Sequence, residues 1–275
     1  MRVEAFDEAE AFLARCDSYF RQTEPRTHLV VGVARSTAKD AYRLAVIDQG
    51  EVVGVAVRTP PWKLLVTPMP DGGLDLLLPE LLARDRELPA VMLGTDLEAG
   101  FVDRWTTSTG ATATRGVPQR LYVLEALQMP TGNGSLRRAG PNDQALATRW
   151  AHAFAADVES PMPTDIGEVV GRHIEQQHLY LWDVDGEVCA MAVGAVRGLS
   201  TARIGLVYTP PELRGRGFGS LVTAHLANHL QGVATHIALF AETQNPTSNR
   251  IYQAIGFRAV VDRIDVSFEY ATSSE

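Results

Sequence analysis

The most informative stretch of this 275-residue chain is Arg214-Gly215-Arg216-Gly217-Phe218-Gly219. It lies between an apolar run of strand length, residues 204–208, and a helix-like run that begins at Ser220. A glycine-rich turn from a strand into a helix start presents unpaired backbone N–H groups and the positive end of a helix dipole. The two arginines add fixed positive charge. The stretch suits a pyrophosphate, although taken alone it also suits an ordinary surface turn.

Two commoner phosphate-binding motifs do not fit the same residues. The dinucleotide fingerprint G-x-G-x-x-G needs a glycine where Ser220 stands, and a P-loop needs a glycine followed by lysine, which this chain lacks. The pattern that fits is Arg-x-x-Gly-x-Gly, formed by Arg214, Gly217 and Gly219. It resembles the acyl-CoA pyrophosphate loop of the GCN5-related N-acetyltransferase (GNAT) family.

A second signature follows in the order that the family has. Residues 245–257 resemble the pattern N-x-x-S/A-x-x-x-Y-x-x-x-G-F. Asn245 and Pro246 form a good helix entry, and Gly256 is expected to close that helix. Residues 236–240 before it, and residues 257–268 after it, have the apolar pattern of strands.

Composition bounds the function. Hydrophobic residues make up 45% of the chain and charged residues 21%, as in a globular domain, and no apolar stretch approaches the length of a membrane span. The first residues lack a signal-peptide core, and Cys16 and Cys189 lie in core-like patterns, so we expect reduced thiols in a cytoplasmic protein. A net charge of −8 argues against general nucleic-acid binding and is compatible with a cationic acceptor.

An internal repeat organises the chain. Residues 44–57 resemble residues 181–193, each reading as strand, glycine-containing turn and strand, and residues 120–125 echo residues 263–268. Linker-like residues 129–135 separate the two copies. We therefore expect an α/β (α+β) protein made of two tandem GNAT folds, each a mixed, largely antiparallel sheet flanked by helices. Residues 1–130 would form a degenerate GNAT-like domain, and residues 135–275 the catalytic one.

The first copy has no cofactor loop of its own. At the corresponding place it carries residues 67–73, which lack the Arg-x-x-Gly-x-Gly pattern and include Asp71. A carboxylate there would repel a pyrophosphate. We expect the first copy to have lost acetyl-CoA binding and to serve as scaffold and cleft wall.

The family resemblance implies acetyl-CoA as cosubstrate and assigns roles within the second copy. The strand with Leu206, Val207 and Tyr208 would splay from its neighbour and hydrogen-bond the pantetheine arm and the thioester carbonyl through its backbone. Asn245 would meet the pantetheine arm, or simply cap a helix, and Asn249 would approach the cosubstrate, or simply be solvated. The pyrophosphate would be held by Arg214, Gly215, Arg216, Gly217, Phe218, Gly219 and Ser220.

Tyr252 is the predicted catalytic side chain. Its hydroxyl, with an ordinary pKa near 10, would give a proton to the departing CoA thiolate, whereas the alternative is a core aromatic ring. A general base stays unassigned, since Glu242, Asp157 and Glu159 are all candidates that also suit a solvated surface.

The function implied by the resemblance is direct transfer of an acetyl group to a primary amine of a small molecule. The first copy and residues 154–178 would shape the acceptor site. A non-catalytic acyl-CoA-binding or sensor module, or acetylation of a protein amine, is the alternative. No metal is expected, because His225 and His229 lie four apart on a helix without the glutamate of a metal motif. We expect a monomer or homodimer, with no nucleic-acid or membrane partner.

Overall fold

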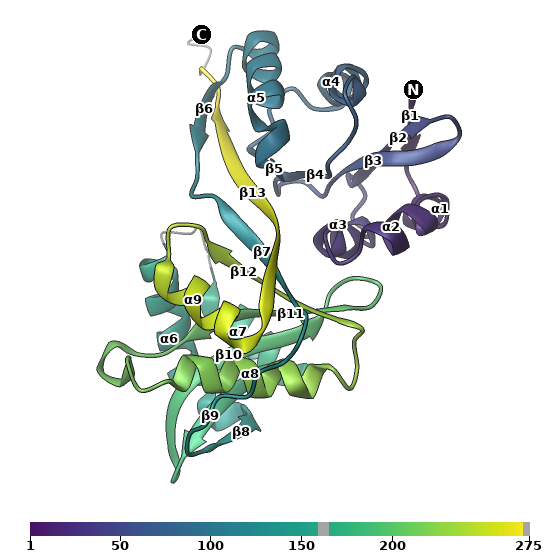
Figure 1. Ribbon diagram of the computed structural model, residues 1–275. Helices are drawn as coiled ribbons and strands as arrows, with labels where there is room; N and C mark the ends of the chain where they lie inside the picture. Colours follow the sequence, from purple (N-terminus) through teal and green to yellow (C-terminus); the bar gives the residue numbers. More distant parts are fainter. Residues whose placement is uncertain (159–164, 272–275) are drawn as a thin grey trace.

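A computed structural model describes residues 1–158 and 165–271 (Figure 1). The first part of the chain forms β1 (Arg2–Phe6), α1 (Ala9–Arg15), α2 (Asp17–Thr23), α3 (His28–Ala34), β2 (Tyr42–Asp48), β3 (Glu51–Arg58), β4 (Leu64–Val66), α4 (Gly73–Arg84), β5 (Ala90–Gly94), α5 (Thr95–Thr109), β6 (Thr112–Arg115) and β7 (Gln119–Leu124). The second part forms β8 (Ser135–Arg138), η1 (Pro141–Asp143), α6 (Gln144–Asp157), α7 (Ile166–Glu175), β9 (Leu179–Val184), β10 (Glu187–Val196), β11 (Thr201–Tyr208), η2 (Pro211–Leu213), α8 (Phe218–Leu230), β12 (His236–Glu242), α9 (Pro246–Ile255) and β13 (Phe257–Glu269).

The strands form one continuous sheet. Within the described residues its order is β1-β2-β3-β4-β5-β13-β7-β12-β11-β10-β9-β8, with β6 beside β13. The β4–β5 and β11–β12 pairs are parallel and the other pairs antiparallel. The expected mixed, largely antiparallel sheet with flanking helices is confirmed.

The two repeated segments are matching hairpins. The β2–β3 turn places Gln49 and Gly50 at φ 49° and 90°, and the β9–β10 turn places Asp185 and Gly186 at φ 53° and 88°. Positive φ at both central positions is the type I′ geometry, whose twist matches that of paired strands. The hairpins predicted from the repeat are therefore present in both halves.

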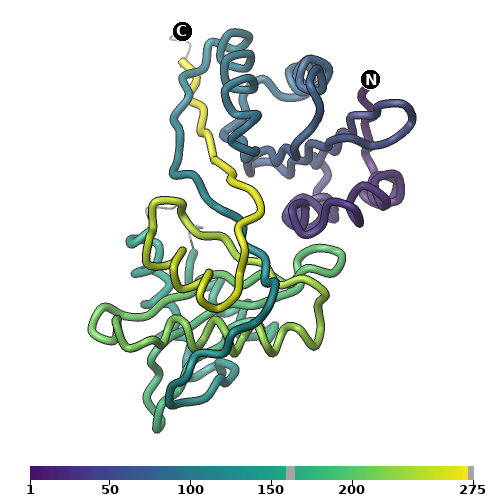
Figure 2. The backbone as a smooth tube through the Cα atoms, in the orientation of Figure 1, coloured from purple at the N-terminus to yellow at the C-terminus, as the bar shows by residue number. Residues whose placement is uncertain are grey.

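The two halves exchange strands across the sequence boundary. β7 lies between β12 and β13, and Arg120 on β7 makes a bidentate ion pair with Asp262 on β13, at 2.7 Å for both N···O contacts. The 13-residue strand β13 then continues into the first half, where it pairs with β5 and β6. Figure 2 shows the chain crossing in both directions. The limits 1–130 and 135–275 stay a prediction, but each half completes its sheet with a strand from the other.

Helices cover both faces of the sheet. In the second half, α8 and α9 pack on one face, here called the cosubstrate face, and α6 and α7 pack on the other, here called the acceptor face. In the first half, α4 and α5 pack on one face and α1 to α3 on the other (Figure 1). Cys16 and Cys189 are free and buried. None of the helices described is both long and apolar enough to cross a membrane.

A carboxylate joins the first half to the second. Glu24, just after α2, accepts hydrogen bonds from the backbone N–H groups of Leu199, Ser200 and Thr201 at 2.8, 3.0 and 3.1 Å, and from the Ser200 hydroxyl at 2.9 Å. Burial raises the pKa of Glu24, but the bonds from Ser200, Thr201 and Leu199 outweigh it and lower that pKa. Glu24 thus clamps the turn between β10 and β11, beside the start of β11.

Buried histidines make the stability of the fold depend on pH. Burial lowers the pKa of His28 to about 4, from 6.5 for the free side chain, so the folded protein keeps this ring neutral. The unfolded chain takes up the proton below pH 6.5. The free energy of unfolding should therefore fall as the pH drops from 6.5 to 4, by about 1.4 kcal/mol per pH unit for His28.

Urea unfolding between pH 7 and pH 4.5 checks this pH dependence. The variant His28→Gln should show a flatter profile than the native chain. His152 lies exposed on α6, so His152→Gln is the matched control and should keep the native slope. Equal slopes in His28→Gln and the native chain would contradict the assignment.

Candidate functional site

A bulge in β11 opens the sheet beside β12. Opposite β10, Tyr208 pairs with Met191 and Gly205 with Val193, so Leu206 and Val207 together face a single residue. Leu206 has φ 50°, an uncommon conformation for a residue with a branched side chain. In the described structure, the parallel pairing of β11 with β12 runs only from Thr201 to Ile204. Beyond Ile204 the strands part, which is the splay expected for Leu206, Val207 and Tyr208.

The loop after β11 leaves a row of N–H groups open. Gly215 and Gly217 adopt φ 78° and 84°, conformations that favour glycine. Gly217 is the N-cap of α8, so the helix begins at Phe218 rather than at the predicted Ser220. No backbone or side-chain acceptor within residues 1–158 and 165–271 receives a hydrogen bond from the N–H groups of residues 215–220. These donors and the positive end of the α8 dipole together suit an anion, as the prediction of a pyrophosphate loop requires.

The side chains of the loop have different roles. Phe218 is buried in the core under α8. Arg216 lies over the Phe218 ring, 4.9 Å from its centre. Arg214 turns toward α6, where its guanidinium contacts Asp157 at 2.5 Å and its Nε donates to the Thr209 carbonyl at 3.0 Å.

The glycine at position 219 is not explained by the packing of the protein. A Cβ at this position would meet only the Thr209 hydroxyl, at 3.5 Å, which is ordinary contact. Alanine would favour the helix by about 1 kcal/mol over glycine. Internal packing therefore does not require glycine here, whereas close approach of a pyrophosphate would.

A cavity opens at the splayed end of β12. It has a volume of about 380 Å³ and is lined by Val117, Asp157, Val158, Glu242, Gln244, Asn245 and Pro246. The ends of α6 and β12 thus bring together two of the three candidate bases. The third, Glu159, lies outside the described residues. Val117 and Gln244 were not expected, and Val117 reaches the cavity only because β7 is exchanged into this half.

The two candidate asparagines hold the fold in place. Asn245 caps α9, because its side-chain oxygen accepts a hydrogen bond from the Ser248 N–H at 3.0 Å. Of its two predicted roles, the helix cap is therefore observed. Asn249 accepts from the Tyr122 hydroxyl at 2.9 Å and donates to the carbonyls of Glu242 and Thr243 at 3.0 and 3.2 Å. These bonds use both ends of the Asn249 amide, so it braces α9 against β7 and β12 and is not simply solvated. A contact of either residue with the cosubstrate stays a prediction.

Tyr252 lies on the inner face of α9. Its ring is 8% exposed and stands 6.3 Å from the rings of both Tyr122 and Phe257. Burial raises the pKa of Tyr252 to about 12, which corrects the expected value near 10, and a hydrogen bond with Ser248 partly opposes the shift. The hydroxyl is therefore protonated at neutral pH, as a proton donor must be. Its catalytic role stays a prediction.

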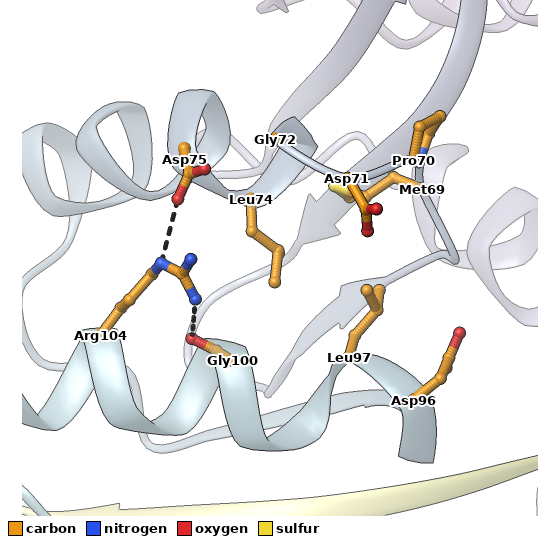
Figure 3. A pocket seen from close by; sticks show the side chains of 10 residues that line it. All are labelled: Met69, Pro70, Asp71, Gly72, Leu74, Asp75, Asp96, Leu97, Gly100 and Arg104. Carbon is orange, nitrogen blue, oxygen red and sulfur yellow. Dashed lines mark hydrogen bonds and ion pairs between the residues drawn. The ribbon is translucent and has the colours of Figure 1, made fainter.

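The first half differs at the corresponding place (Figure 3). β4 is three residues long, without the bulge of β11, and a cavity of about 190 Å³ lies between the starts of α4 and α5. Asp71 and Asp96 point into this space, and the guanidinium of Arg104 is already held by Asp75 at 3.0 Å and by the Gly100 carbonyl at 2.9 Å. The negative charge of Asp71 and Asp96 disfavours a pyrophosphate in this cavity, as the predicted loss of acetyl-CoA binding requires.

The histidine pair on α8 serves packing. The His225 ring lies 4.7 Å from the Trp182 ring, and the His229 ring 5.4 Å from the Tyr180 ring. Each histidine is thus an aromatic neighbour of a strand residue on the cosubstrate face. Among the residues described, no group of His, Cys, Asp and Glu side chains is arranged to hold a metal ion.

Comparisons with known proteins agree with this geometry. Residues 184–265 match the model of the family described as FR47-like protein. No curated protein sequence matches the chain. An acetyltransferase from the GNAT family of Colwellia psychrerythraea is 17% identical, with a TM-score of 0.62 over 98% of this chain and 100% of that one.

Two further solved structures share the fold over nearly the whole chain. A GCN5-related N-acetyltransferase from Sphaerobacter thermophilus is 14% identical, with a TM-score of 0.56 over 96% of this chain and 95% of that one. A tandem GNAT protein from the clavulanic acid biosynthesis pathway is 15% identical, with a TM-score of 0.55 over 100% of both chains. The chain therefore has the fold of these GNAT proteins, and residues 184–265, within its second half, match the FR47-like family model.

Proposed function

We propose that this protein transfers an acetyl group from acetyl-CoA to a primary amine of a small molecule. The observation that carries the proposal is the open row of N–H groups at residues 215–220, directly beside the splay between β11 and β12. An anion site next to a gap between strands suits a long cosubstrate with a pyrophosphate at one end and a reactive thioester at the other.

The backbone does most of the binding in this proposal. The N–H groups from Gly215 to Ser220 hold the pyrophosphate, and the bare surface at Gly219 lets it approach. Leu206, Val207 and Tyr208 lie beyond Ile204, the last residue of β11 that is described as paired with β12, and their backbone groups on that side hold the pantetheine arm and polarise the thioester carbonyl. Asn245, at the edge of the cavity, borders the same arm.

The chemical step is a direct displacement. The amine nitrogen forms a bond to the acetyl carbon, and the bond from that carbon to sulfur breaks. The amine loses a proton to a carboxylate of the cavity, and the thiolate gains one from Tyr252. Glu242 and Asp157 both line the cavity, and the base stays unassigned among Glu242, Asp157 and Glu159.

The Tyr252→Phe variant should lower turnover by about ten-fold or more, because a general acid typically contributes at least that much. Acetyl-CoA affinity should barely change, since the pyrophosphate loop is untouched. Steady-state release of free thiol measures the first quantity, and titration calorimetry the second. Unaltered turnover would remove Tyr252 from the mechanism and leave it as a core ring.

The rival function is acyl-CoA binding without catalysis. Free-thiol release from acetyl-CoA with a panel of small amines separates the two. Release that depends on an amine supports the enzyme, and tight binding without release supports the sensor. Transfer to the amine of a peptide, without transfer to any small amine, would indicate that the acceptor is a protein.

A further inference from the structure

Arg203 occupies a seam between the two halves on the acceptor face. Its neighbours along β11, Ala202 and Ile204, pack in the core under α8, so the alternation of the strand turns Arg203 to the opposite face. Its partners on the adjacent strands are small, Ala195 on β10 and Ala238 on β12. We use the name Arg203 seam for the strip of this face formed by Arg203, His173 of α7 and His28 of α3.

The guanidinium of Arg203 has no counter-charge among the residues that the structure describes. In residues 1–158 and 165–271, it makes no hydrogen bond or ion pair, and the side chain keeps some exposure to solvent. Burial and then the nearby Arg197 lower the pKa of Arg203 to about 10, so it is charged at neutral pH. A largely buried charge normally has a partner, because leaving it unpaired costs several kcal/mol.

The rest of the seam adds polar atoms without partners. The Nε2 atom of His28 and the Nδ1 atom of His173 are buried and, within the described residues, unbonded. Both histidine rings feel Arg203 as a like charge, after the larger effect of burial. The carboxylate of Glu24, near His28, is already occupied by the turn of residues 199–201. The Arg203 seam is therefore positive, and its guanidinium has no anionic partner among the described residues.

The position of the seam connects it to the proposed reaction. Arg203 immediately precedes Ile204, the last residue paired with β12, so it stands where the splay begins. The pyrophosphate loop leads into α8 on the cosubstrate face, so the amine has to reach the thioester from the acceptor face. Glu242 in the cavity is four residues beyond Ala238, the partner of Arg203, or about 13 Å along the strand.

We propose that the Arg203 seam binds a carboxylate carried by the acceptor, which makes the acceptor an amino acid or a similar carboxylate-bearing amine. The inference rests on the proposed acetyl transfer. Arginine suits this role because its planar guanidinium can donate two parallel hydrogen bonds to a carboxylate. The acceptor nitrogen then lies toward the splay and the cavity, and its carboxylate toward Arg203.

Matched acceptors test the proposal. The common amino acids are compared with the amines that lack their carboxylate, such as phenylalanine with phenethylamine and lysine with cadaverine, by thiol release from acetyl-CoA. The native protein should prefer a carboxylate-bearing member. Arg203→Gln should raise KM for that member by about ten- to a hundred-fold, the usual value of a charge-assisted pair, and leave its amine counterpart unchanged. Arg203→Lys should recover part of the preference.

A binding measurement separates this proposal from the proposed function. The same amino acids should raise the melting temperature of the native protein but not that of Arg203→Gln, whether or not transfer occurs. Arg172 lies exposed on α7, so Arg172→Gln is the matched control and should behave as native. Arg203→Gln should itself be as stable as the native chain or more so, which excludes misfolding.

Transfer to amines without any preference for a carboxylate would overturn the seam proposal and leave acetyl transfer standing. Carboxylate-dependent stabilisation without any transfer would support the seam as an anion site and contradict the proposed function. Absence of both effects would overturn both.

Discussion

Replacing Gly217 by glutamate is expected to abolish acetyl-CoA binding, weakening it by a hundred-fold or more in a calorimetric titration. The new side chain would stand at the N-cap of α8, among the N–H groups that have no acceptor within the described residues. Its carboxylate would compete for those donors and repel the pyrophosphate, and each effect is worth on the order of 1–3 kcal/mol.

A matched control separates charge from backbone strain. Gly110, the C-cap of α5, also has a positive φ, 73°, and a Cβ there would meet nothing within 4 Å, as at Gly217. Gly110→Glu and Gly217→Glu should therefore share the same backbone strain, about 1–2 kcal/mol for a side chain in the left-handed region. The helix dipole should add to the loss of stability at the C-terminus of α5 and offset part of it at the N-terminus of α8. Only Gly217→Glu should lose binding. Normal binding by Gly217→Glu would show that the loop does not hold the cosubstrate.

Separating the two halves is expected to abolish folding. Residues 135–275 alone would lack β7, which is hydrogen-bonded on both sides by β12 and β13 and carries the fully buried Tyr122. Residues 1–134 alone would lack the part of β13 that pairs with β5. Each fragment would expose a long apolar strand edge, so we expect aggregation rather than cooperative unfolding.

A chain cut within residues 129–134 is the control for the fragments. Both pieces are then present, so the exchanged strands should keep the cut protein folded, with a circular dichroism spectrum like that of the intact chain. A monomeric 135–275 fragment that unfolds cooperatively would show that the exchanged strand is dispensable.

Local sequence signals gave a good account of the second half. The glycine-rich loop, the Asn245 cap and the Gly256 end of α9 were all predictable, because each depends on a residue type with a conformational preference. The same holds for the last strand, predicted over residues 257–268 and found as Phe257–Glu269. The start of α8 was predicted at Ser220 but lies at Phe218, since Gly217 takes the left-handed N-cap conformation.

Long-range features were not predictable. The strand exchange could not be predicted, because a strand has the same pattern of apolar and polar residues whether it pairs within its own half or with the other half. Asn249 and Glu24 find their partners across the sheet, so no local spacing marks them. Arg203 is a single charged residue in an apolar strand. The role proposed for it depends on its nearness to His28 and His173, which belong to other elements.

The most direct test of the central claim is calorimetric titration of the native chain with acetyl-CoA. We predict one site per chain with micromolar affinity, because in residues 1–158 and 165–271 the open N–H groups occur together with a splayed strand pair only in the second half. Two sites of similar affinity would contradict the predicted loss of binding in the first half. No binding would contradict the account as a whole, since the loop at residues 214–220 would then have no ligand.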